Sequence, residues 1–459
     1  MGRRARKSGM ARGKRHDSAG RRDTVLRAAI VFPQIKWIRN FPTRASFADE
    51  NIDFVIFPEA YINPPLMRPI KSLKGLAADL DATLLVGATD NRVDSTDRYY
   101  QILLRIDPDG WHKRVYVKHS SADAVAFERS LWTPDSMLPT FDLAGARAGT
   151  TICHDHYLGL LPRFLASCGA QIYINPSFNN VDEIKWSSVL RLRAVENRMF
   201  SLCTLHDDLG TSRTHPFAFS PDGHELLARR AGGRTSRPLS ACRDPDSIYI
   251  VELDLRMVDE ELAWGKVPTA DELASPRPQK PPNTVPKMPV RVRQFDGQPT
   301  MHCRSKWQGV EQPGCDLDTD HGSVYVGIVP EDQILDAAAC FRVIDRAKQA
   351  NCIPIIWNVW GALPAESSRL ATLMLGRAIE CCAPVIISDR NRIHELVELS
   401  SNYKIPTRRP ILTSGEAIVN LEYAKGLDSA FRIVRKDGPK LRRGKAFERM
   451  ALERYRRLA

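Results

Sequence analysis

The chain has 459 residues, 43% of them hydrophobic, which is ample for packed cores and too long for one ordinary small domain, so we expect two domains. The formal net charge of +12 lies at the two ends: residues 1–22 and residues 432–459 each carry +8, and the rest of the chain carries about −4. Basic tails attract polyanions weakly and without sequence preference, which argues against sequence-specific nucleic-acid recognition.

The sequence also indicates where the protein resides. No stretch approaches the roughly 18 apolar residues of a membrane-spanning helix, and residues 1–22 lack the apolar run of a secretory signal. The ten cysteines, including the adjacent Cys381 and Cys382, form no regular framework, which favours a reducing compartment. We expect a soluble cytoplasmic protein without a membrane span, whose tails make weak, nonspecific contacts with polyanions.

From residue 24 the chain alternates short apolar runs with amphipathic segments, a pattern typical of layered α and β structure. The predicted elements are strands in VLRAAIVFP (25–33), FVIFPE (54–59) and TLLVGATD (83–90), a hairpin over 100–118, a strand in GARAGTTICHD (145–155) that ends at the Cys, a helix in LGLLPRFLASCGA (158–170) and a buried strand in QIYINPS (171–177). A helix in WSSVLRLRAVENRMF (186–200) and a hairpin in FAFSPDGHELLA (217–228) follow.

The composition of the chain changes in its second half. Prolines break any regular element between about 264 and 321, which predicts a long linker. Strands are then predicted in SVYVGIV, CIPIIWN and APVIISD, separated by helices over 331–350 and roughly 364–382. The predicted organisation is a basic tail (1–23), a first α/β domain (24–256), a Pro-rich linker (257–321) and a smaller α/β unit (322–459) closed by the basic helix GKAFERMALERYRRLA.

Three predicted strand ends carry complementary groups: Glu59 in FVIFPEAYI, Lys118 in RVYVKHS and Cys153 in TTICHDH. Strand ends are where a layered scaffold exposes reacting groups. A carboxylate in a partly dry pocket can take the proton of a thiol. An ammonium lowers the pKa of a neighbouring thiol and, with the backbone N–H of His154, stabilises a tetrahedral oxyanion. The trio therefore predicts acyl-transfer chemistry.

Each of these residues also has a structural explanation when taken alone. A Cys on an apolar strand is more often a packed small hydrophobe, a Lys at a strand end is usually solvated, and a Glu after Pro is usually a loop residue. The spacing of the three residues does not exclude these structural explanations. Their order in the chain and the residues around them favour a catalytic role.

Those surrounding residues resemble the motifs of the nitrilase or carbon-nitrogen hydrolase superfamily over about residues 25–255. The segments that carry the resemblance, in the family's order, are Pro58-Glu59-Ala60, Tyr116-Val117-Lys118, Cys153-His154-Asp155, Arg163 with GAQIYINPS, Arg193-Ala194-Val195-Glu196-Asn197 and HPFAFSPDGHELL. The resemblance implies an α-β-β-α sandwich of the nitrilase type. It also implies that Glu59 is the general base, Lys118 the cation that stabilises the intermediate and Cys153 the nucleophile, with no cofactor.

Glu128, in FERSLWTPDS, lies where the family often has a second glutamate. The resemblance implies that it helps to position Lys118 or the substrate, and a surface loop carboxylate is the alternative. The chain also departs from the family, because many members have Pro-Glu where this chain has Leu158-Gly159, and HDHYLGLL is unlike the Cys-Trp-Glu of true nitrilases. An amide or carbamoyl substrate is therefore favoured over a nitrile.

A metal site is disfavoured at Cys153-His154-Asp155-His156. On an extended strand these four residues would point to alternate faces, and the usual spacer between zinc ligands is absent. His302, Cys303, Cys315 and His321 fit no standard spacing either, so we expect no metal.

The C-terminal unit has one weak sequence similarity to the first domain. Arg377-Ala378-Ile379-Glu380 is similar to Arg193-Ala194-Val195-Glu196, and each follows the Asn of an apolar run, Asn358 or Asn175, by 19 or 18 residues. This pattern is typical either of a degenerate, non-catalytic half-sandwich or of chance likeness between two β-α-β segments. No Ser-Gly-Gly-x-Asp-Ser phosphate-binding signature is present, which disfavours fusion to a nucleotide-activating synthetase.

The sequence thus predicts a thiol-dependent hydrolase of a non-peptide carbon-nitrogen bond, acting on a small amide-type molecule through a Cys153 thioester. Two alternatives remain open: an acyltransferase that uses the same thioester, and a non-catalytic sandwich that serves as an interaction scaffold. A homodimer could form through the exposed face of the sandwich, or the C-terminal unit could cover that face instead.

Overall fold

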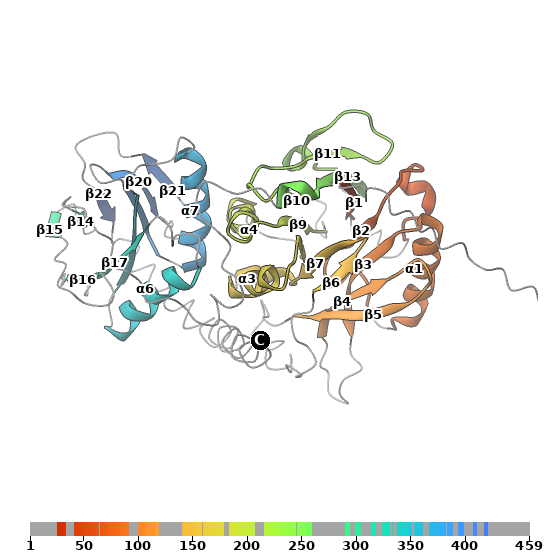
Figure 1. Ribbon diagram of the computed structural model, residues 1–459, viewed down its shortest axis with the longest axis horizontal. Helices are drawn as coiled ribbons and strands as arrows, with labels where there is room; N and C mark the ends of the chain where they lie inside the picture. Colours follow the sequence, from red (N-terminus) through yellow and green to blue (C-terminus); the bar gives the residue numbers. More distant parts are fainter. Residues whose placement is uncertain are drawn as a thin grey trace, which may run out of the picture.

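The computed structural model of the protein (Figure 1) describes two sets of residues. The first set is 25–33, 41–63, 65–90, 100–118, 140–157, 159–178, 183–206, 215–244 and 246–258. The second set is 290–293, 299–303, 314–317, 324–330, 333, 337–350, 353–360, 367–381, 383–388, 393–398, 407–410 and 417–420. None of the helices in these ranges combines the length and the apolar character needed to cross a lipid bilayer.

The first sheet has eight strands in the order β12-β11-β13-β1-β2-β3-β4-β5, with β1, β2 and β3 parallel. Its strands are β1 (Val25–Phe32), β2 (Phe54–Ile56), β3 (Thr83–Asp90), β4 (Tyr100–Ile106), β5 (His112–Val117), β11 (Leu227–Arg230), β12 (Arg237–Pro238) and β13 (Ser247–Asp254). Alternate side chains of β1 enter different cores, because successive residues of a strand point to opposite faces. Ala28 and Ile30 pack toward the second sheet, whereas Ala29 and Val31 pack toward helix α1 (Met67–Leu80).

The second sheet has the order β10-β9-β8-β7-β6. Its strands are β6 (Phe141–Leu143), β7 (Ala146–Thr150), β8 (Ile172–Pro176), β9 (Phe200–Thr204) and β10 (Phe217–Phe219). Strands β7, β8 and β9 are parallel and are joined by the crossover helices α3 (Leu160–Ser167) and α4 (Glu183–Asn197). With α1 outside the first sheet and α3 and α4 outside the second, the layers form the α-β-β-α sandwich that the sequence predicted (Figure 1).

The C-terminal part adds a six-stranded sheet, β16-β17-β18-β19-β20-β21, and a small sheet, β15-β14-β22. The elements are β14 (Val290–Arg293), β15 (Pro299–Cys303), β16 (Gly314–Leu317), β17 (Val324–Pro330), α6 (Ala337–Gln349), β18 (Ile353–Val359), α7 (Ser367–Cys381), β19 (Val385–Ser388), β20 (Ile393–Glu398), β21 (Thr407–Pro410) and β22 (Ala417–Asn420). Helix α7 packs directly on α4 (Figure 1), so one apolar core continues from the sandwich into the C-terminal sheet.

Short 3-10 turns complete the sandwich at η2 (Arg44–Phe47), η3 (Cys153–Tyr157), η4 (Leu239–Ala241) and η5 (Leu255–Val258). The structure differs from the sequence expectations in three places. Strand β7 ends at Thr150, before the Cys. The expected hairpin over 217–228 forms only a single bridge between Phe219 and Glu225, and β10 and β11 belong to different sheets. Strands β14, β15 and β16 lie within the stretch expected to be a linker. β15 and β16 are edge strands, which tolerate prolines, and the described residues of β14 contain none.

Several expectations fall on residues outside the described set. These are the basic tail of residues 1–23, most of the Pro-rich stretch over 259–289 and the basic helix of 444–459. The boundaries of the predicted domains therefore stay predictions.

Candidate active site

Glu59 lies in the loop that follows β2, where the chain crosses over β3. The backbone here passes so close to Gly87 that a Cβ on Gly87 would lie 2.1 Å from the Pro58 carbonyl oxygen and 2.6 Å from Glu59 Cα. No larger residue would leave room for this approach. Hydrogen bonds from Phe57 N to Leu85 O and from Ile62 N to Gly87 O fix both ends of the loop, and the Glu59 carboxylate is buried.

Lys118 follows the last residue of β5 and is tied to β4 by a hydrogen bond from its N–H to Gln101 O. Its Nζ donates to Glu59 Oε1 at 2.7 Å, and both side chains are largely shielded from solvent. Burial alone would lower the pKa of Lys118, but the neighbouring Cys153 and Glu59 outweigh burial and raise it. Lys118 is therefore a persistent cation at the centre of the site.

Cys153 opens the 3-10 turn η3 three residues after the last residue of β7 and has a φ of 50°, a left-handed conformation that costs a residue other than glycine about 1–2 kcal/mol. Two side chains hold its carbonyl oxygen in place: Asn175 Nδ2 donates to it at 3.2 Å, and His156 Nδ1 lies 2.7 Å from it. Burial lowers the pKa of His156 well below its usual value, so the ring is neutral. The carbonyl can only accept, which places the ring proton on Nδ1.

The Cys153 thiol is buried, and its environment keeps it protonated. Burial and the Glu59 carboxylate raise its pKa to about 12, although Lys118 and the backbone N–H of Phe178 act in the opposite direction. Glu59 Oε2 is buried and has no hydrogen-bond partner of good geometry among the described residues. The site thus holds a neutral thiol beside a carboxylate with one unengaged oxygen and a cation, and these three groups can transfer a proton and stabilise an oxyanion.

The part of the chain that holds these three residues is similar to known proteins. Residues 27–254 match the sequence model of the carbon-nitrogen hydrolase family. This segment belongs to the carbon-nitrogen hydrolase family. No curated protein sequence matches the chain.

Solved structures similar to the carbon-nitrogen hydrolase segment cover about half of the chain. A carbon-nitrogen hydrolase from Helicobacter pylori G27 has 17% identity and a TM-score of 0.41, covering 52% of this chain and 91% of that one. A double mutant of the amidase from Nesterenkonia sp. AN1, in complex with acrylamide, has 15% identity and a TM-score of 0.41, covering 53% and 97%. Saccharomyces cerevisiae Nit3, a member of branch 10 of the nitrilase superfamily, has 20% identity and a TM-score of 0.40, covering 56% and 96%.

A metal site at residues 153–156 was disfavoured on the assumption of an extended strand, and the structure shows that this assumption was wrong. Residues 153–157 form a 3-10 turn and not an extended strand, so their side chains do not alternate between two faces. Asp155 accepts a hydrogen bond from Tyr116 OH at 2.7 Å, and the His156 ring packs against Tyr157 and Trp186. Within the described residues no group of three or more His, Cys, Asp or Glu side chains is placed to hold a metal ion.

The other predicted site residues are not placed by the structure. Glu128 lies outside the described residues, as does His321, and the side chains of His302, Cys303 and Cys315 are not described. The structure adds two positioning roles to the hydrolase segment that sequence reasoning missed. Gly87 had a signal, a lone glycine inside an apolar strand, which often marks a close backbone approach. The contact of His156 with the Cys153 carbonyl had none, because it depends on the turn.

Proposed function

We propose that the protein hydrolyses a non-peptide carbon-nitrogen bond in a small amide or carbamoyl compound, with Cys153 as the nucleophile. The observation that carries this proposal is the state of Glu59. One of its oxygens is held by Lys118 at 2.7 Å, and the other, in a buried site beside a protonated thiol, has no hydrogen-bond partner of good geometry among the residues that the structure describes. A thiol in this state needs a base at the moment of attack, and a fixed, desolvated carboxylate is suited to that task.

In the first half-reaction Glu59 takes the thiol proton while Cys153 Sγ forms a bond to the substrate carbonyl carbon. The carbonyl π electrons move to oxygen, and the Lys118 ammonium lies where it can stabilise the negative charge. Glu59 then gives its proton to the substrate nitrogen as the carbon-nitrogen bond breaks. The products of this step are a free amine, or ammonia, and a thioester on Cys153.

In the second half-reaction Glu59 removes a proton from water as the water oxygen attacks the thioester carbon. Collapse of this second tetrahedral intermediate breaks the carbon-sulfur bond, and Glu59 returns the proton to the departing thiolate. The sum is amide plus water giving acid plus amine, and Glu59, Lys118 and Cys153 end in their starting states. An amine in place of water would give acyl transfer by the same steps.

The experiment is a screen of primary amides, carbamoyl compounds and nitriles for release of ammonia, with the acyl-enzyme trapped by rapid acid quench and located by mass spectrometry. We expect turnover of an amide or a carbamoyl compound and a mass increase on the peptide that contains Cys153. Cys153→Ala should abolish both signals, whereas Cys242→Ser, which alters a buried thiol near η4, should keep them. Turnover that survives Cys153→Ala would refute the proposal.

A further inference from the structure

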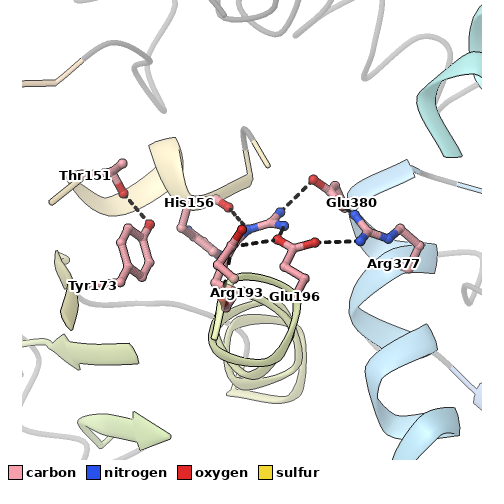
Figure 2. Close-up of polar contacts among 8 residues, drawn as sticks. Thr151, His156, Tyr173, Arg193, Glu196, Arg377 and Glu380 are labelled. Carbon is pink, nitrogen blue, oxygen red and sulfur yellow. Dashed lines mark hydrogen bonds and ion pairs between the residues drawn. The ribbon is translucent and has the colours of Figure 1, made fainter. Parts of the chain in front are cut away.

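Helices α4 and α7 are joined by a ring of four buried charges (Figure 2). Within each helix an arginine donates to the glutamate three residues later: Arg193 to Glu196, and Arg377 to Glu380. Between the helices Arg193 donates to Glu380 at 2.7 Å and Arg377 donates to Glu196 at 2.6 Å. The contacts are reciprocal, as they are across the two-fold axis of a symmetric dimer, although both helices belong to one chain.

The two positive and two negative charges of the ring balance, and the ring is shielded from water. All four side chains are fully buried. Burial acts against every charge, but the neighbours outweigh it, so that the pKa values of Arg193 and Arg377 are raised and that of Glu196 is lowered. Removing one member would leave an uncompensated buried charge, which is strongly unfavourable.

The C-terminal sheet repeats the strand plan of the second sheet of the sandwich. In β6 to β10 an antiparallel strand precedes three parallel strands, and another antiparallel strand follows them. Strands β16 to β20 have the same order and the same directions. The crossover helices also correspond, α3 to α6 and α4 to α7. The two helices that share the ring are therefore equivalent elements of two similar layers.

A side-chain hydrogen bond supports this equivalence. Asn175 of β8 donates from Nδ2 to the Thr151 carbonyl at the end of the preceding parallel strand, at 3.3 Å. Asn358 of β18 donates from Nδ2 to the Val329 carbonyl in the corresponding place, at 3.0 Å. Cys153 comes two residues after Thr151, whereas Glu331 comes two residues after Val329. The second layer thus keeps this hydrogen bond and has Glu331 at the sequence position that corresponds to Cys153.

The ring is connected to the nucleophile turn. Arg193 Nε donates to the His156 carbonyl at 2.8 Å (Figure 2), and His156 in turn holds the Cys153 carbonyl. The Glu380 carboxylate also lies directly over Gly159, which precedes α3. A Cβ at Gly159 would be 2.0 Å from Glu380 Oε1 and 3.0 Å from an Arg193 guanidinium nitrogen. Helix α7 therefore contacts the segment that carries Cys153 as well as α4.

The fit between the helices favours α7 over a second copy of α4. A Cβ at Gly376 would lie 2.5 Å from Ser188 O and 3.0 Å from Leu192 Cβ, so the two helices approach closely at this glycine. By the equivalence of Arg193 with Arg377, Gly376 corresponds to Leu192. In a symmetric pair of α4 helices a leucine would stand where α7 has glycine, and this close approach would be blocked.

We infer that residues 314–398 act as a partner subunit within the chain: a half-sandwich that has no cysteine at the position equivalent to Cys153, covers α4 and, through Arg377 and Glu380, positions the turn that carries Cys153. Arg377 and Glu380 are positioning residues and do not contact the reacting atoms. The catalytic part of this inference rests on the proposed function. Its structural part, that α7 occupies the face of α4 in place of a second chain, does not.

The test uses two variants of the full chain. Glu380→Gln removes one charge from the ring, and Gly159→Ala inserts a methyl group between Gly159 and Glu380 without changing any charge. Gly75→Ala is the matched control, because Gly75 lies in α1 and a Cβ there meets no atom within 4 Å. Should Glu380→Gln fail to fold, Arg377→Lys replaces it, since lysine keeps the charge and loses the forked geometry.

Three readouts are measured for each variant: hydrogen exchange of residues 153–157, the rate of Cys153 alkylation, and mass by light scattering. We expect Glu380→Gln and Gly159→Ala to raise exchange in the turn and to change the alkylation rate of Cys153 about tenfold or more, because a displaced turn alters both the exposure of the thiol and its distance from Glu59 and Lys118. Gly75→Ala should match the unmodified chain, and α4 should not be protected further when the protein concentration is raised.

Two results separate the parts of the inference. Unchanged exchange and unchanged alkylation in both folded variants would overturn the positioning role. Concentration-dependent protection of α4 would show that a second chain docks there and would overturn the in-chain subunit. If the unmodified chain turns over no amide or carbamoyl compound but exchange of the turn still rises in both variants, the proposed function fails while the positioning role stands.

Discussion

The ion pair between Glu59 and Lys118 engages a single carboxylate oxygen, Oε1, which lies 2.7 Å from Nζ. Lys118 thereby fixes the orientation of Glu59 and leaves Oε2 for the thiol. The pair also acts on Cys153 in two directions, because the carboxylate raises the pKa of the thiol and the ammonium lowers it. The two residues can therefore be separated experimentally by the sign of their effect on the same group.

We expect opposite shifts in the pH dependence of Cys153 alkylation when the two charges are removed. Glu59→Gln should lower the pKa of the thiol from its value of about 12, because the negative charge that disfavours thiolate is gone. Lys118→Met should raise it further. Each pKa unit changes the thiolate fraction at neutral pH about tenfold. The measurement is the iodoacetamide rate between pH 6 and 10 by mass spectrometry, with half-buried Cys168 as the internal reference. Shifts in the same direction would contradict the assignment.

Hydrolysis should respond differently from alkylation. Both Glu59→Gln and Lys118→Met should lose about 10²-fold or more in kcat, since the base or the oxyanion cation is missing during turnover. A faster alkylation of Cys153 together with lost hydrolysis in Glu59→Gln is the expected signature of a base that acts during attack. Steady-state rates of ammonia release on the substrate found by screening provide the measurement.

Gly87→Ala should displace Glu59 while leaving the side chains of Glu59, Lys118 and Cys153 unchanged. The new Cβ would lie 2.1 Å from the Pro58 carbonyl oxygen, so the loop must move, and a shift of about 1 Å costs roughly 10²-fold in rate. Gly75→Ala, a glycine-to-alanine change in open space, should keep full activity. Rates and thermal unfolding of both variants are compared, and an active Gly87→Ala enzyme would show that the loop does not fix the base.

Asn175→Ala should destabilise the fold and the nucleophile turn together. It removes the donor that serves the Cys153 carbonyl, the Thr151 carbonyl and Thr151 Oγ1, all buried. Buried acceptors without a donor cost about 1–3 kcal/mol. Urea unfolding measures this loss. Ser201→Ala, at a buried hydroxyl on neighbouring β9, is a control expected to change the free energy of unfolding less.

Acidification should destabilise the protein in two steps. Burial lowers the pKa of His156, so the unfolded chain binds more protons below about pH 6.5 and stability falls as the pH drops toward the folded pKa. The ring of four buried charges between α4 and α7 adds a second loss of stability at lower pH. Despite burial, Arg193 and Arg377 lower the pKa of Glu196, so its contribution is present above the unfolded value near 4.5 and is lost through the folded pKa.

Urea unfolding between pH 8 and 3 measures both steps. The slope from His156 should not exceed about 1.4 kcal/mol per pH unit. His156→Asn, whose amide can replace the Nδ1 donor, should flatten the curve between about pH 6.5 and 5 while leaving the lower step in place. An unchanged slope in this variant would assign the first step to another group.

Local pattern was sufficient to predict much of the sandwich from the sequence. Strands β1, β3 and β8 and helix α3 follow from apolar runs and from glycines that end them. The assembly of Glu59, Lys118 and Cys153 was expected from their places at strand ends together with the family resemblance, and the structure brings the three together. Their catalytic roles stay predictions, and so does the role of Glu128.

Features that depend on distant parts of the chain were not predictable. Helix α4 is buried on nearly all sides because one side packs on the sheet and another on α7, yet its sequence contains Arg193 and Glu196, which by themselves indicate an exposed face. Arg377 and Glu380 of α7 complete the pairing of these two charges. Likewise, nothing local indicates that β10 and β11 enter different sheets. The left-handed φ of Cys153 also depends on Asn175, twenty-two residues away.

The packing of α7 on α4 within one polypeptide has a consequence for how the protein responds to dilution. Two separate chains find each other at a rate set by their concentration, and their complex dissociates when the solution is diluted. Helices on the same chain meet at an effective concentration that the intervening residues set, and dilution of the solution does not change it. The contact that buries Arg193, Glu196, Arg377 and Glu380 is therefore retained in a very dilute solution as fully as in a concentrated one.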